Sequence, residues 1–62
     1  MNTTSSSTGP LAVRPDAAAE MLGVSRDFFD EHVLRELRYV RRGRAILIPV
    51  AELERWLEEQ AR

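Results

Sequence analysis

The short connection between two helical patterns constrains the fold of this chain more than any other feature of its sequence. The first pattern runs from Pro15 to Leu22 and stops at Gly23, because glycine readily takes the left-handed conformation that ends a helix. Ser25 follows two residues later, and serine is a favoured N-cap because its hydroxyl accepts a hydrogen bond from a free backbone N–H. The sequence therefore predicts two short helices joined by a tight turn.

Apolar spacing predicts which side of each helix faces a core. The inward side of the first helix is expected to consist of Ala18, Ala19 and Leu22. In the second helix, Phe29 and Val33 lie one turn apart and form the inward stripe, with His32 expected as a packed residue beside them. Both helices are thus expected to bury one side in a shared core.

Ala19, Gly23 and Phe29 have the spacing of a helix-turn-helix. A small side chain such as Ala19 lets two helices cross closely, and a glycine permits the turn between them. The bulky ring of Phe29 then fills the inner side of the second helix. This interpretation makes the second helix, headed by Ser25 and Arg26, the recognition helix of the motif.

A pattern with the period of a β-strand follows the second helix. Positions 37–41 and 45–48 are rich in branched and aromatic residues, with a basic turn between them. The tip of the turn consists of Arg42, Gly43 and Arg44. Strict alternation places Ile46 and Ile48 on one face of the second strand and exposes Leu47 on the other. The pattern predicts a β-hairpin whose tip is positively charged.

A last amphipathic helix begins after Pro49 and runs from Val50 to about Gln60. Its apolar stripe consists of Val50, Leu53, Trp56 and Leu57. Trp56 is expected to anchor this stripe on the first helix and the hairpin. The result is a small α+β winged helix-turn-helix, with two short helices, a β-hairpin wing and a C-terminal helix over residues 11–60. The Ser/Thr-rich residues 1–10 are expected to form a disordered tail.

Charge is distributed unevenly along the chain, although its formal net value is only −1. Positions 37–48 hold four arginines and no acid, whereas positions 49–62 hold four glutamates against two arginines. Every basic residue is arginine, the side chain that forks onto a phosphate or onto the edge of guanine. Double-stranded DNA is therefore the expected partner, and the basic hairpin is an expected contact.

Several classes of function are not expected from this composition. The chain has no cysteine and one histidine, His32, so neither a disulfide nor a cluster of metal ligands is expected. Catalysis and a bound cofactor are not expected either, because His32 lacks a nucleophile partner and so short a chain leaves little room for a pocket. The first residues lack the basic and apolar segments of a signal peptide, which predicts a cytoplasmic protein without membrane contact.

Three segments of the chain resemble a known family. They are residues 18–26 (AAEMLGVSR), 41–44 (RRGR) and 48–57 (IPVAELERWL). These segments resemble the excisionase branch of the MerR-like winged helix-turn-helix domains, most closely the small excisionases of actinobacterial phages such as mycobacteriophages. The resemblance covers residues 11–57. Arg14 stands where related members usually have serine or threonine, so the first helix lacks a side-chain cap.

The resemblance implies an excisionase, or recombination directionality factor. Such proteins place the second helix in a major groove, bind side by side at direct repeats of an attachment site, bend the DNA and direct a tyrosine-type integrase towards excision. The charge polarity of this chain suggests that its copies associate head to tail on the DNA in the cytoplasm of a bacterial host. The residues expected to contact DNA are Ser25, Arg26, Asp27, Phe28 and Asp30 of the recognition helix, with Arg38, Arg41, Arg42, Gly43 and Arg44 of the wing region.

The recognition helix carries three acids, which are Asp27, Asp30 and Glu31. An acid accepts a hydrogen bond from the amino group of cytosine, whereas an acid that faces a phosphate repels it. We therefore expect some of these acids to hold an arginine in place, such as Arg26 or Arg35. The neighbouring Phe28 is expected either at the edge of the core or on the outer side, where its ring would touch a thymine methyl.

Two other functions remain open at this point. The same fold would serve a small transcriptional regulator of a prophage promoter, for which a stable dimer on an inverted repeat would be diagnostic. A protein-interaction adaptor would instead use the acidic last helix for a partner and would have lost affinity for DNA. Salt-dependent binding to any duplex would exclude the adaptor.

Overall fold

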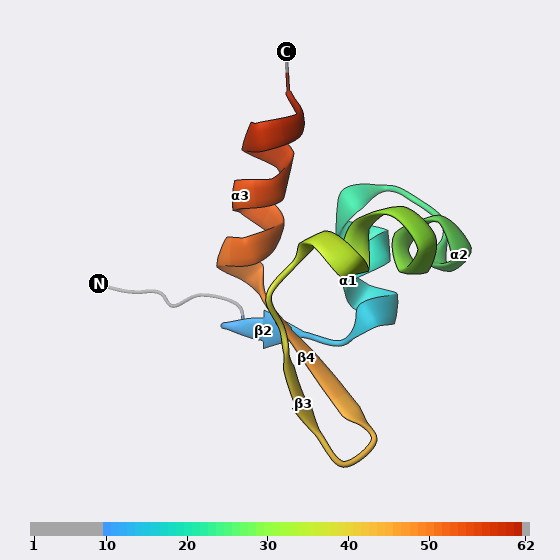
Figure 1. Ribbon diagram of the computed structural model, residues 1–62, viewed down its shortest axis with the longest axis vertical. Helices are drawn as coiled ribbons and strands as arrows, with labels where there is room; N and C mark the ends of the chain where they lie inside the picture. The colour runs from blue at the N-terminus through green and yellow to red at the C-terminus, as the bar shows by residue number, and fades with distance from the viewer. Residues whose placement is uncertain (1–9, 62) are drawn as a thin grey trace.

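The computed structural model describes residues 10–61, which Figure 1 traces from the short strand β2 to the end of helix α3. The elements in chain order are β2 (Ala12–Val13), α1 (Pro15–Leu22), α2 (Arg26–Phe28), the π-helical segment η1 (Phe29–Val33), the 3₁₀ segment η2 (Leu34–Glu36), β3 (Val40–Arg42), β4 (Ala45–Pro49) and α3 (Val50–Gln60). The tail predicted at residues 1–10 lies outside the described residues, apart from Pro10. Within the described part of the chain, no helix is long and apolar enough to cross a membrane.

Hydrogen bonds hold both ends of the turn between α1 and the second helix. Gly23 has a φ of +76°, and its N–H donates to the carbonyl of Glu20 at 3.0 Å. The Oγ of Ser25 accepts a hydrogen bond of 3.1 Å from the N–H of Phe28. The glycine stop and the serine cap predicted from the sequence are both confirmed, and they set the angle at which the second helix leaves α1.

The second helix is continuous along the chain, but its pitch changes along its length. It is α-helical in α2, π-helical in η1 and 3₁₀ in η2, whereas the sequence predicts one regular helix. The wide turn is closed by the N–H of Leu34, which donates to the carbonyl of Phe29 five residues back. Phe29 and Val33 are both fully buried, as predicted. Residues four apart share a side of the helix at either pitch, so the sequence does not reveal the π-helical turn.

The wing belongs to a three-stranded antiparallel sheet with the order β2-β4-β3. On one side β4 pairs with β3, in a register that sets Val40 opposite Leu47. On its other side β4 pairs with β2, in a register that sets Val13 opposite Ile48. The sequence gives no separate signal for β2, because a strand of two residues is defined by its partner and has no pattern of its own. The hairpin of β3 and β4 projects away from the helices (Figure 1).

The first strand of the hairpin is shorter than the sequence predicts. It starts at Val40, not at Leu37, because Leu37 turns into the core directly after η2 and is only 7% exposed. At the tip, Arg42 pairs with Ala45 across a two-residue turn. Gly43 opens this turn with a φ of +57°, a conformation that favours glycine. The glycine at the tip therefore has the role that the pattern predicts.

The core gathers side chains from the helices and the sheet around the central strand. Its buried members are Ala18, Ala19, Phe29, Val33, Leu37, Ile48 and Leu53. Ile48 of β4 is among the largest of the fully buried side chains, and both α1 and α3 contact its strand. Helices and sheet thus close on one cluster, which confirms the predicted small α+β winged helix-turn-helix fold.

Two apolar positions differ from those that periodicity predicts. Leu47 is half-buried and not exposed, because it lies in the central strand with neighbours on both sides. Its partner Val40, on the edge strand, is instead 47% exposed. Leu57 belongs to the predicted stripe of α3 but is 49% exposed. This residue lies towards the end of α3, one turn beyond the buried Leu53.

His32 also differs from the prediction, because its side chain is exposed and not packed in the core. Its ring lies against that of Phe28, with the ring centroids 4.7 Å apart. A π-helical turn advances each residue through a smaller angle than an α-helical turn does. Three residues after Phe29, His32 is therefore rotated farther from the inward side than a regular helix would place it.

The central position of Ile48 leads to a test of the core. We expect Ile48→Val to lower the free energy of unfolding by about 0.5–1.5 kcal/mol, because it removes a methylene from a fully enclosed site. Ile46 lies in the same strand at a half-buried position. The matched variant Ile46→Val should therefore lower the free energy of unfolding by less. Chemical denaturation of the two variants measures the difference, and equal losses would contradict this account of the core.

Candidate nucleic-acid interface

The wing presents its arginines without a neutralising partner. Arg41, Arg42 and Arg44 are exposed, and no carboxylate of residues 10–61 forms an ion pair with any of them. Arg41 and Arg42 are adjacent in β3, so their side chains point to opposite faces of the hairpin. The wing therefore carries positive charge on both faces, at the end that projects farthest from the helices (Figure 1).

Arg26 at the head of the second helix is held between two carboxylates. Its Nε donates to Oδ1 and Oδ2 of Asp30 at 3.0 and 3.1 Å, and its Nη1 donates to Oδ1 of Asp16 at 2.6 Å. The hydrogen bonds to Asp30 and Asp16 raise the pKa of Arg26. The expectation that an acid of the recognition helix holds Arg26 is thus confirmed for Asp30. Sequence reasoning missed Asp16, which lies ten residues away and meets Arg26 only because of the turn.

The other predicted residues of the recognition helix lie around this arginine. Ser25 uses its oxygen as the helix cap, and Asp27 is exposed beside it. Phe28 is 44% exposed and its ring covers His32, which places it at the edge of the fold. Contact of this ring with a thymine methyl stays a prediction. Arg35, the other arginine expected to pair with an acid, has no ion pair among the described residues.

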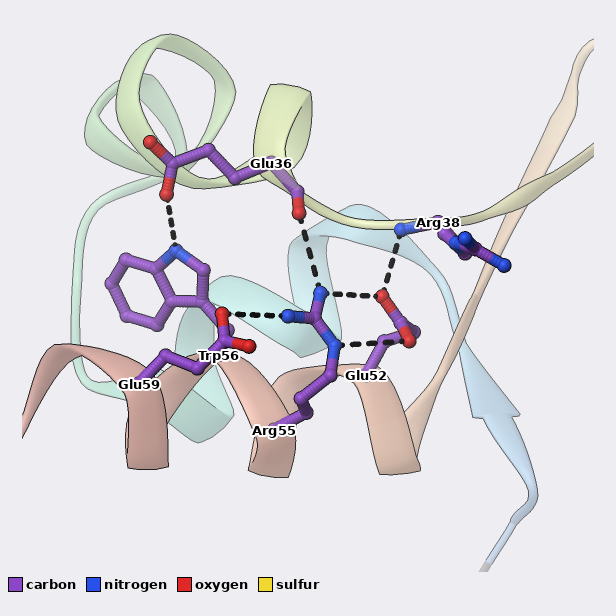
Figure 2. Close-up of polar contacts among 6 residues, drawn as sticks. All are labelled: Glu36, Arg38, Glu52, Arg55, Trp56 and Glu59. Atoms are coloured by element: carbon purple, nitrogen blue, oxygen red, sulfur yellow. Dashed lines mark hydrogen bonds and ion pairs between the residues drawn. The ribbon is translucent and has the colours of Figure 1, made fainter.

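A polar cluster joins the start of the wing to α3 (Figure 2). The Oε1 of Glu52 accepts a hydrogen bond of 2.9 Å from the backbone N–H of Arg38. Arg55 binds the same oxygen through Nη2 at 2.8 Å and binds Glu59 through Nη1 at 2.7 Å. Arg38 therefore takes part in this cluster through its backbone, while its side chain is exposed.

The same cluster fixes the end of the recognition helix. Nη2 of Arg55 donates to the backbone carbonyl of Glu36 at 3.4 Å. Nε1 of Trp56 donates to the side-chain Oε1 of Glu36 at 2.7 Å. Trp56 is half-buried against the core, so it is an anchor of α3 as predicted, but one with a polar end. Figure 2 shows that these contacts join Glu36 and Arg38, on either side of Leu37, to α3. Sequence reasoning missed this cluster, and the only sequence signal for it was the spacing of Glu52, Arg55 and Glu59 along one side of α3.

The hydrogen bonds of this cluster shift the titration of its charged groups. The Arg55 guanidinium, and after it the backbone N–H of Arg38, lower the pKa of Glu52 from an ordinary 4.5 to about 2. The carboxylates of Glu52 and Glu59 raise the pKa of Arg55. Both effects favour the charged pair in the folded protein. Ionised Glu52 therefore stabilises the contacts that join residues 36–38 to α3.

The fold and these surfaces define a class of protein, the winged helix-turn-helix DNA-binding domain. The turn, the second helix and the basic wing occur in the arrangement that the class requires. The chain belongs to the helix-turn-helix domain family, whose model matches residues 13–61. No curated protein and no solved structure matches the chain. DNA binding is the function that this family membership indicates.

The lowered pKa of Glu52 predicts how stability depends on pH. Because its pKa is lower folded than unfolded, Glu52 stabilises the fold above pH 4.5, and this contribution is lost as the pH falls towards 2. We expect Glu52→Gln to be less stable than the parent protein at neutral pH, with a difference in thermal midpoint that shrinks as the pH falls through this range. Glu54→Gln is the control, because Glu54 is exposed on the same helix without an ion pair in the described residues. A constant difference for Glu52→Gln would contradict the assignment.

Proposed function

We propose that the protein is a non-catalytic architectural DNA-binding protein of the excisionase type. Several copies would bind direct repeats at an attachment site, bend the DNA and direct a tyrosine-type integrase towards excision. The observation that carries this proposal is the wing, whose three exposed arginines lack ion pairs within residues 10–61. The family also includes excisionase-like proteins, which supports this choice within the DNA-binding class.

The size of the interface supports action by several copies. The second helix is short, and its first arginine, Arg26, already donates hydrogen bonds to two carboxylates. A single copy therefore offers few phosphate contacts and few base contacts, and a lone copy should bind weakly. Adjacent copies that touch one another raise the local concentration of each binding surface. A row of copies is thus the form in which this interface would reach useful affinity.

The distribution of charge supports a head-to-tail arrangement of those copies. The basic wing and α3 extend in opposite directions from the sheet (Figure 1). On α3, Glu54 and Glu58 are exposed, and neither forms an ion pair within the described residues. A contact between the wing of one copy and α3 of the next joins two different surfaces, so it does not close on itself and extends as a row. If successive copies are rotated relative to one another, the DNA beneath them must bend.

The wing arginines provide the first test of DNA binding. We expect Arg42→Ala and Arg44→Ala each to weaken binding to every duplex, and to reduce the slope of log K against log salt by about 1, because each removes one phosphate contact. Arg14→Ala removes an exposed arginine far from the wing in sequence and serves as the control. Fluorescence anisotropy at several salt concentrations measures the slope. Unchanged slopes for both wing variants would exclude the wing as the contact.

Cooperativity provides the test of the architectural role. On DNA with several direct repeats, we expect footprints that appear together over a narrow range of protein concentration, together with increased electrophoretic retardation from bending. The double variant Glu54→Gln/Glu58→Gln should retain affinity for a single repeat but lose cooperativity. An excision assay with integrase, with and without the protein, tests the direction of recombination. A single non-cooperative complex would contradict the proposal, whereas a stable dimer on an inverted repeat would favour a transcriptional regulator.

A further inference from the structure

Arg26 differs from the arginines of the wing in its surroundings. It lies between Asp30, one turn further along its own helix, and Asp16, in the first turn of α1. The Arg26 side chain is 46% exposed, so a large part of it is open to solvent. The described wing arginines have no such partners. The protein therefore exposes two chemically different kinds of arginine, one held by carboxylates and the others without ion pairs in the described residues.

The hydrogen bonds of Arg26 leave part of its guanidinium available. A guanidinium has five N–H donors. Nε–H is shared by the two oxygens of Asp30, and one N–H of Nη1 is given to Asp16. Three donors remain, two of them on Nη2. Guanine needs two donors, for its O6 and its N7. One N–H of Nη1 and one of Nη2 form the fork that can bind a guanine edge while both carboxylates keep their hydrogen bonds.

The charge of the group discriminates between two kinds of acceptor. One guanidinium and two carboxylates have a formal charge of +1 − 2 = −1. Such a group repels a phosphate, which carries a full negative charge, but it can still donate hydrogen bonds to the uncharged edge of a base. The carboxylates also fix the orientation of the guanidinium in advance, which reduces the entropy lost on binding. Both effects favour a base over the DNA backbone.

We propose that Asp16, together with Asp30, makes Arg26 a reader of guanine and prevents it from acting as a phosphate contact. Asp16 is thus a positioning residue for sequence recognition, although it lies on α1 and outside the recognition helix. This inference rests on the proposed binding of DNA. It assigns the sequence-independent contacts to the wing and one base contact to Arg26.

The variant Asp16→Asn tests the inference because it releases Nη1 of Arg26 from a charged partner and changes the formal charge of the group from −1 to 0. The probes are a duplex of A·T pairs only, which offers no guanine, and a library of duplexes with a randomised centre. We expect Asp16→Asn to bind the A·T duplex several-fold more tightly, with a salt slope steeper by about 0.9, as for one added phosphate contact. Sequences selected from the library should show a weaker preference for guanine at one position.

Two further variants separate this effect from a general change of charge. Glu20→Gln makes the same charge change on α1 at an exposed residue that has no ion pair in the described part of the chain. Arg26→Lys keeps the positive charge but loses the fork, so the guanine preference should fall by about tenfold or more while affinity for the A·T duplex is kept. Thermal midpoints verify that each variant is folded.

The outcomes distinguish the two proposals. If the parent protein binds neither probe, both the proposed function and this inference are wrong. If the parent protein binds DNA but Asp16→Asn behaves as Glu20→Gln does on both probes, the inference alone is overturned. The inference is supported if Asp16→Asn has both a steeper salt slope and a weaker guanine selection, while Glu20→Gln shows neither change.

Discussion

The burial of Ile48 in the central strand is the interaction on which the rest of this structure depends. Its strand pairs with β2 on one side and with β3 on the other, and both α1 and α3 contact it. A chain of this size has few other side chains with which to hold its elements together. The wing is an extension of the same strand, so the segment that buries Ile48 also carries the arginine-rich tip into solvent. Core packing and the position of the wing are therefore not independent of one another.

The features that the sequence predicts well are those that depend on neighbouring residues. Gly23 and Ser25 define the turn, Gly43 defines the tip of the wing, and the spacing of Phe29 and Val33 identifies the buried side of the second helix. Each is a local requirement of backbone conformation or helix pitch, so a short stretch of residues contains the whole signal. The basic wing is predicted for the same reason, because its arginines are adjacent in the chain.

The features that the sequence does not predict depend on contacts between distant segments. Strand β2 exists only because β4 pairs with it, and the exposure of His32 follows from a π-helical turn that has no signature in apolar spacing. The ion pair between Asp16 and Arg26 requires the angle set by the turn, and periodicity contains no information about that angle. The contact of Asp16 with Arg26 and the hydrogen bonds that join the wing to α3 therefore became visible only in three dimensions.

The polar cluster of Glu52, Arg55 and Glu36 has a mechanical consequence. β4 runs directly into α3, and the hydrogen bond between Glu52 and the N–H of Arg38 fastens the other root of the wing to the same helix. The wing is thus attached to α3 at both of its ends, and the two extend in opposite directions from the sheet (Figure 1). Both roots of the wing therefore converge on the first turn of α3, which contains Glu52. A shift of that turn would displace the two strands of the wing together.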